Sequence, residues 1–188
     1  MDRIAPLDEQ GTLDQFRDQF TKLRLWGMTE YGSVLYLDSD ALVIRSIDDL
    51  LQTDLGMNAI GVAADFSAGL WRLTFNMGVF LIRPNATEYE RLLRLHQYSS
   101  VDFEATIAVQ GFLNVVYKDR WHDIGFRNNA NLAIYSQLRS YWNFHEQEIC
   151  VIHYSMSLPW NCSSEYEQPC SLWQAAAGID YHERLPVV

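Results

Sequence analysis

Two carboxylates stand at a spacing that suits the binding of one cation. Asp38 and Asp40 are separated by a single residue and directly follow the apolar run Val34–Leu37. Residues i and i+2 of an extended chain point the same way, so both carboxylates can meet one ion. The loop turns apolar again at Ala41 and has no glycine at its sixth position, which excludes an EF-hand. A solvated turn capped by an aspartate is the alternative, because a D-x-D tripeptide is frequent by chance.

A third ligand of the right chemistry follows a later apolar run. His153 comes directly after residues 150–152 and would complete a set of two aspartates and one histidine. Carboxylates favour hard divalent ions such as Mg²⁺ and Mn²⁺, and an imidazole shifts the preference toward Mn²⁺. A lone histidine after a strand is more often structural, so both interpretations stay open.

A glycine interrupts the apolar segment Phe75–Phe80. Gly78 within a strand pattern indicates the close approach of a ligand or of another backbone, and a β-bulge is the alternative. Asn76 beside it offers a donor and an acceptor. Gln110 and Lys22 fall on predicted helices and carry no signal by themselves.

The elements that must position these residues alternate between strands and helices, which predicts an α/β fold. The continuously apolar run 34–37 predicts a central strand, buried on both faces of a mixed but mostly parallel sheet, with Asp38 at its carboxyl end. Thr12 and Gln15 are expected to form a capping box, and Asn85 an N-cap. The expected helices are 12–31, 85–97, 103–117 and 172–177, with one helical turn at 47–51, and the expected strands are 34–37, 60–64, 75–82 and 150–154. The segment 121–143 is not assigned.

Charge and composition narrow the class of partner. The 188 residues predict a single domain over 1–188, and 14 Lys and Arg against 24 Asp and Glu give a net charge of −10. That balance argues against nucleic acid and anionic membranes as partners. The longest stretch without a charged residue, 149–164, is too short for a transmembrane helix.

Cysteine usage and the N-terminus bear on the compartment. Cys150, Cys162 and Cys170 form an odd, sparse set without a C-x-x-C pair, which favours a reducing compartment over a disulfide scaffold. Residues 1–6 contain no apolar signal region. We therefore expect a cytoplasmic protein, with a membrane anchor or signal upstream of this chain left open.

Taken together and in order, these motifs resemble the glycogenin-like glycosyltransferases of family 8, which have the GT-A fold. The resemblance covers nearly the whole chain, although the first βα units, which in the family hold uracil and ribose, are expected to be missing. The motifs that carry it are Thr21–Leu23, Leu35–Asp40, Ile47–Leu50, Phe75–Phe80, Gln110–Asn114, His153–Tyr154 and Pro159–Asn161.

The resemblance implies a retaining transfer of a hexosyl group, with glucose expected, from a UDP-sugar. It implies that Asp38, Asp40 and His153 bind Mn²⁺, or else Mg²⁺. The residues that it places at the donor are Lys22, Ser39, Asn76, Gly78 and Gln110, and Asn76 and Gln110 are also implied to be catalytic. The acceptor, a glycan or a protein, is not named by the sequence, and a homodimer is left open.

Two positions depart from the family pattern and keep a second function open. Val109 stands where the family usually has an acidic residue before Gln110, and Leu158 stands where it usually has a lysine. The alternative is therefore a catalytically impaired remnant of the fold that acts as a binding module. Self-glucosylation on Tyr135 is a further reading that the local spacing does not assign.

Overall fold

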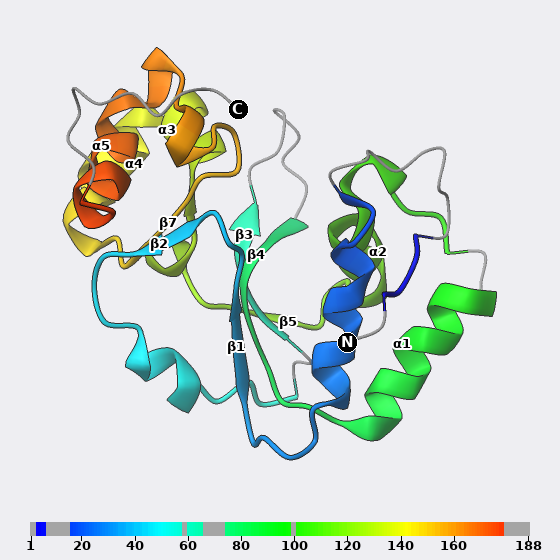
Figure 1. Ribbon diagram of the computed structural model, residues 1–188. Helices are drawn as coiled ribbons and strands as arrows, with labels where there is room; N and C mark the ends of the chain where they lie inside the picture. Colours follow the sequence, from blue (N-terminus) through cyan, green and yellow to red (C-terminus); the bar gives the residue numbers. More distant parts are fainter. Residues whose placement is uncertain (1–2, 7–15, 58–59, 66–73, 99–100, 179–188) are drawn as a thin grey trace.

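The computed structural model describes residues 3–6, 16–57, 60–65, 74–98 and 101–178. Two small mixed sheets, each with helices packed beside it, make up this part of the chain (Figure 1). The predicted α/β class is confirmed. Within the described residues no helix is both long and apolar enough to cross a membrane.

The first sheet has the strand order β1-β4-β3-β5. Strand β4 pairs antiparallel with both β1 and β3, while β3 pairs parallel with β5. The prediction of a mostly parallel sheet is therefore wrong for the described strands. The strands are β1 (Val34–Leu37), β3 (Ile60–Asp65), β4 (Thr74–Ile82) and β5 (Trp121–Asp123).

The predicted central position of residues 34–37 is also wrong, because β1 lies at the edge of the described sheet. Val34 and Tyr36 pack against one apolar cluster, and Leu35 and Leu37 pack against another. Both faces of the strand thus pack against apolar clusters, with their side chains half-buried, while one edge has no described neighbour. A continuous apolar run reports covered faces and does not report how many strands are hydrogen-bonded beside it.

Helices α1 (Ala86–Tyr98) and α2 (Ala108–Val116) cover one side of this sheet, together with the 3₁₀ helix Gln19–Gly27 (Figure 1). The side chain of Asn85 accepts a hydrogen bond from the Glu88 amide at 3.0 Å, which confirms the predicted start of α1. The side chains that these helices bury together include Phe20, Leu23, Trp26, Leu92 and Phe112. Within the described residues, the segment of the predicted helix 12–31 instead contains the 3₁₀ helix Gln19–Gly27, which ends before residue 31, and the predicted capping box lies outside the described residues.

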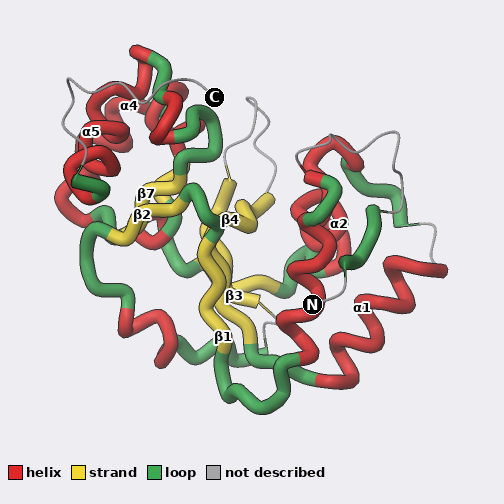
Figure 2. The backbone as a smooth tube through the Cα atoms, viewed as in Figure 1, coloured by secondary structure: helices red, strands yellow, loops and turns green. Residues whose placement is uncertain are grey.

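The second sheet has the order β2-β7-β6 and lies beside the helices of the C-terminal part of the described chain (Figure 2). Strand β7 pairs antiparallel with β2 and parallel with β6. Three of these elements, β6, α3 and α4, come from the segment that the sequence left unassigned. The bounds are β2 (Ala41–Val43), β6 (Ala130–Asn131), β7 (Val151–His153), α3 (Leu132–Gln137), α4 (Arg139–His145) and α5 (Glu167–Ala176).

A disulfide joins Cys162 to Cys170, and Cys150 is free and buried. The odd number and sparse spacing of the cysteines favoured a reducing compartment over a disulfide scaffold, and they gave no sign of this disulfide. Cys170 is buried on α5, and the loop before that helix brings Cys162 back to it. That approach is decided by tertiary structure.

The two sheets meet at the chain segment between β1 and β2. Asp38 follows β1 directly, and the Ala41 amide donates to the Asp38 carbonyl at 3.0 Å to close a tight turn. The turn carries both aspartates and leads the chain from the first sheet into the second. The D-x-D pattern therefore marks the junction of the sheets.

Candidate active site

Asp38, Asp40 and His153 converge where the two sheets meet. Strand β2 pairs Ala41 with His153, which brings the histidine beside the turn that carries the aspartates. One ligand atom from each of the three side chains lies within 4.8 Å of the others. His153 Nε2 is 3.5 Å from Asp40 Oδ1. The structure thus brings together the three side chains that the sequence singled out.

The electrostatics of this cluster favour an ionised carboxylate. Burial acts to raise the pKa of Asp40, but the hydrogen bond and charge of His153, together with a backbone hydrogen bond and the charge of Lys22, hold the pKa below its usual range. Two carboxylates and one imidazole form a donor set that suits a divalent ion such as Mn²⁺. The residues present therefore fit a metal ion.

Lys22 brings a buried positive charge to the same place. Its Nζ lies 2.8 Å from Asp38 Oδ1 and 3.4 Å from the Met77 carbonyl. The ammonium also lies 4.9 Å from the centroid of the Tyr36 ring. The Tyr36 hydroxyl donates to Asp38 Oδ1 at 2.8 Å, and its pKa is raised, chiefly by burial and then by Asp38. Asp38 is thus held by two donors from its own fold.

A bulge in β4 directs main-chain groups into the site. The pairing with β3 shifts between Val62 and Ala63, so that residues 77–79 of β4 are skipped in the ladder. The Met77 amide donates to Gln110 Oε1 at 3.1 Å, and the Gly78 carbonyl accepts from the Asp38 amide at 2.8 Å. The bulge that the sequence offered as an alternative to a close approach is present, and it positions site residues.

The amide of Asn76 is held by its neighbours. Its Oδ1 accepts from the Gly78 amide at 2.8 Å and from Asn129 Nδ2 at 2.9 Å. Asn76 is 7% exposed and Asn129 only 1%. The Oδ1 atom therefore serves the fold, and the Nδ2 group is the part of Asn76 left for a ligand.

Gln110 is tied to a carboxylate that the sequence did not single out. Its Nε2 donates to Asp65 Oδ2 at 3.0 Å, and Asn131 Nδ2 lies 3.4 Å from Asp65 Oδ1. Asp65 ends strand β3 in the same way that Asp38 follows β1, so its position after an apolar run was an available signal. Asn129 and Asn131 fall in the segment that the sequence left unassigned, where their close spacing was the one signal that could have drawn attention to them.

Comparison with known proteins shows the family of this chain. The model of glycosyl transferase family 8 matches residues 15–163. The chain belongs to glycosyl transferase family 8. It is 27% identical over 173 residues to glycogenin of Neurospora crassa, an alignment that covers 88% of this chain and 24% of that protein. It is 30% identical to glycogenin-1 of Homo sapiens over 148 residues, which cover 75% of this chain and 39% of that protein.

Solved structures share the fold of this chain. A crystal structure of an active-site mutant of LgtC matches with a TM-score of 0.66 at 22% identity, over 86% of this chain and 66% of that one. GlyE of Streptococcus pneumoniae TIGR4 matches with a TM-score of 0.65 at 25% identity, over 89% of this chain and 44% of that one. The expected GT-A fold is thereby confirmed. The chain spans less than half the length of the two glycogenins.

Family 8 enzymes typically use a divalent metal, and the cluster around His153 supplies a group that fits one. The remaining predicted donor residue, Ser39, is exposed in the turn between the two aspartates. Val109, which departs from the family pattern, is fully buried in the larger apolar cluster. Leu158, the other departure, is 43% exposed before the 3₁₀ helix Pro159–Asn161.

Tyr135 is buried in the second apolar cluster at 2% exposure. Its hydroxyl donates to Gln168 Oε1 at 3.2 Å, and the Arg139 guanidinium lies 3.3 Å from the ring centroid. In this arrangement the Tyr135 hydroxyl is hydrogen-bonded within the fold and is not presented to receive a glucosyl group.

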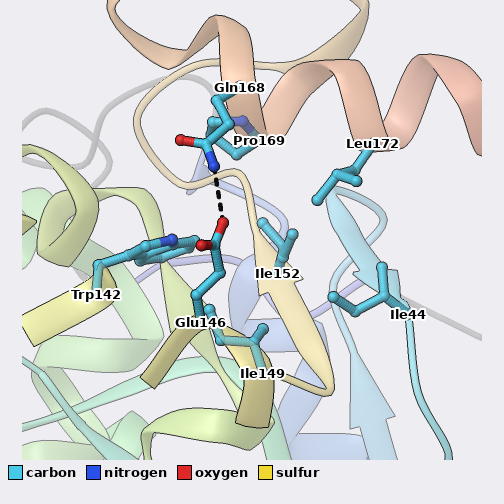
Figure 3. Close-up of a pocket in the computed structure, with 8 residues that line it drawn as sticks. All are labelled: Ile44, Trp142, Glu146, Ile149, Ile152, Gln168, Pro169 and Leu172. Carbon is cyan, nitrogen blue, oxygen red and sulfur yellow. Dashed lines mark hydrogen bonds between the residues drawn. The ribbon is translucent and has the colours of Figure 1, made fainter. Parts of the chain in front are cut away.

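A small pocket lies apart from these residues, between the second sheet and the helices beside it (Figure 3). Gln168 Nε2 donates to Glu146 Oε1 at 2.7 Å across it. No residue predicted to bind metal or donor lines it. The lining residues are Ile44, Trp142, Glu146, Ile149, Ile152, Gln168, Pro169 and Leu172.

Proposed function

We propose that this chain carries the donor side of a retaining hexosyltransferase that takes its sugar from a UDP-sugar, with glucose as the expected hexose. The observation that carries the proposal is the convergence of Asp38, Asp40 and His153 within 4.8 Å, in a chain of family 8. These three residues would hold Mn²⁺. A bound divalent ion supplies positive charge that stabilises the departing diphosphate.

The other site residues suit the same reaction. The Lys22 ammonium beside Asp38 adds a cation at the end of the site where negative charge develops on the leaving group. In this proposal Asn76, through its Nδ2 group, and Gln110 would orient the donor sugar. Asp65 lies against Gln110 and adds a carboxylate near the place where the resemblance puts the anomeric centre.

A binding module without turnover is the second candidate, and the two departures favour it. Val109 puts an apolar, buried side chain where the family usually has an acidic one. Leu158 presents no cation in the exposed segment after β7. Asp65 offsets the first loss in part because it brings a carboxylate to Gln110 from another strand.

Hydrolysis and transfer of UDP-glucose, measured with and without Mn²⁺, tests the proposal. We expect Mn²⁺-dependent release of UDP by the wild-type chain and a loss of at least about tenfold in Asp40→Ala, because one ligand is removed. Calorimetry with Mn²⁺ on both proteins separates the candidates. Binding without turnover would support the binding module, whereas equal Mn²⁺ binding by wild type and Asp40→Ala would overturn the metal site.

A further inference from the structure

The imidazole of His153 lies directly over the α-carbon of Gly78. A Cβ atom built on Gly78 would stand 2.1 Å from His153 Cε1, 2.3 Å from Nδ1 and 2.7 Å from Nε2. Real Cβ atoms do not approach other heavy atoms this closely. The φ angle of Gly78 lies outside the left-handed region, so its backbone conformation is open to other residues. Glycine is needed here for space alone.

The backbone of Gly78 reaches a second member of the cluster. Its carbonyl accepts the Asp38 amide at 2.8 Å, and its own amide donates to Asn76 Oδ1 at 2.8 Å. Asn129 holds the same oxygen at 2.9 Å. Gly78 therefore contacts an aspartate that follows the first sheet and a histidine that belongs to the second.

Gly78 and His153 are both buried and lie in paired strands. His153 is 5% exposed and paired with Ala41 in the second sheet, and the next residue, Tyr154, donates its amide to the Asp40 carbonyl at 2.9 Å. On the other side, Val79 is fully buried beside Gly78 and paired with Leu37 of β1. A methyl group at Gly78 would have to turn the imidazole away from Asp40 or separate the two sheets.

We propose that Gly78 is a positioning residue of the metal site, which seats the His153 ring by having no side chain. The resemblance assigned Gly78 to the donor sugar, a role that makes different predictions. The identity of the ion rests on the proposed function, whereas the contact between Gly78 and His153 does not. The two can therefore fail separately.

The test is a double-mutant cycle with Gly78→Ala, His153→Ala and the double variant. Thermal unfolding without metal reports the contact itself. We expect Gly78→Ala to lower the melting temperature by about 5 °C or more, because the methyl group overpacks a buried ring. In the His153→Ala background the same methyl group enters the space left by the ring, so the double variant melts no lower than His153→Ala.

Titration of Mn²⁺ without nucleotide, followed by the loss of the free-ion EPR signal, reports the metal site. We expect Gly78→Ala to weaken Mn²⁺ binding by at least about tenfold, as the removal of a group that orients a ligand does. Gly32→Ala is the matched control, because its Cβ meets no described atom within 4 Å, and it should match wild type in both assays.

Additive losses of stability in the cycle would overturn the seating role. Unchanged Mn²⁺ binding by Gly78→Ala, with weaker binding of UDP-glucose but not of UDP, would overturn the proposal in favour of a sugar contact. If wild type itself binds no Mn²⁺, the metal assignment and the proposed function fall together. The melting cycle would then still decide whether Gly78 seats His153.

Discussion

Lys22 and a bound divalent ion should compete for the same carboxylate. The Lys22 ammonium is 8% exposed and lies 2.8 Å from Asp38 Oδ1, while the Asp38 side chain is 21% exposed. Replacing Lys22 by Met keeps most of the volume and removes the charge. Without metal, Asp38 then faces Asp40, and among the described residues the Tyr36 hydroxyl, at 2.8 Å, is the side-chain donor that remains to hold it.

The expected cost follows from how far Asp38 is buried. Breaking a fully buried ion pair by removing one partner costs about 3–5 kcal/mol. Because Asp38 keeps some solvent and the Tyr36 hydroxyl, we expect about 2 kcal/mol for Lys22→Met, a melting point lower by about 4–8 °C. Mn²⁺ should offset this loss, since a ligand at about one hundred times its Kd adds about 2.7 kcal/mol to the free energy of unfolding.

Urea unfolding with and without Mn²⁺, together with Mn²⁺ calorimetry, measures these terms. We expect Lys22→Met to bind Mn²⁺ at least as tightly as wild type, because the competing ammonium is gone, and to bind UDP more weakly. Lys118→Met is the matched control, since Lys118 is exposed, and it should change neither the free energy of unfolding nor the binding of Mn²⁺ and UDP. Mn²⁺ binding weakened about tenfold in Lys22→Met would refute the competition and show that the ammonium supports the site.

Three further predictions concern stability. Burial lowers the pKa of His96, with a smaller opposing effect of the Ala5 backbone, so the unfolded chain takes up a proton that the folded protein does not. The free energy of unfolding should therefore fall as the pH drops below about 6.5. Measured by urea unfolding between pH 7.5 and 5.5, it should fall less steeply for His96→Phe than for wild type, once the two are compared relative to their values at about neutral pH. Reduction of the Cys162–Cys170 disulfide should lower the melting temperature of wild type and leave Cys162→Ser/Cys170→Ser unchanged, and an equal response of both would contradict the pairing. Val109→Asp puts an acidic residue where the resemblance implies one. It should lower the free energy of unfolding, measured in urea, by at least about 3 kcal/mol, because it places a charge in a fully buried position. A stable, more active variant would show that the side chain at this position can turn toward Gln110.

Local sequence patterns predicted the elements that hold the site. The apolar run of β1, the Asn85 cap of α1 and the segment of β7 all form where the sequence placed them. Each of these depends on residues within a few positions of one another, through strand propensity or a cap. The ligand types could be named for the same reason, because Asp38 and Asp40 are neighbours whose chemistry is visible without a fold.

What the sequence by itself determined was therefore the class of fold, the family pattern and the candidate site residues. Tertiary structure decided how they meet: β1 lies at an edge, β4 bulges, and Asp65 and Asn129 reach Gln110 and Asn76 from distant segments. It also paired Cys162 with Cys170. The physical reason is that strand pairing and side-chain contact between distant segments depend on how the whole chain packs, and a local pattern records which faces are covered but not by what.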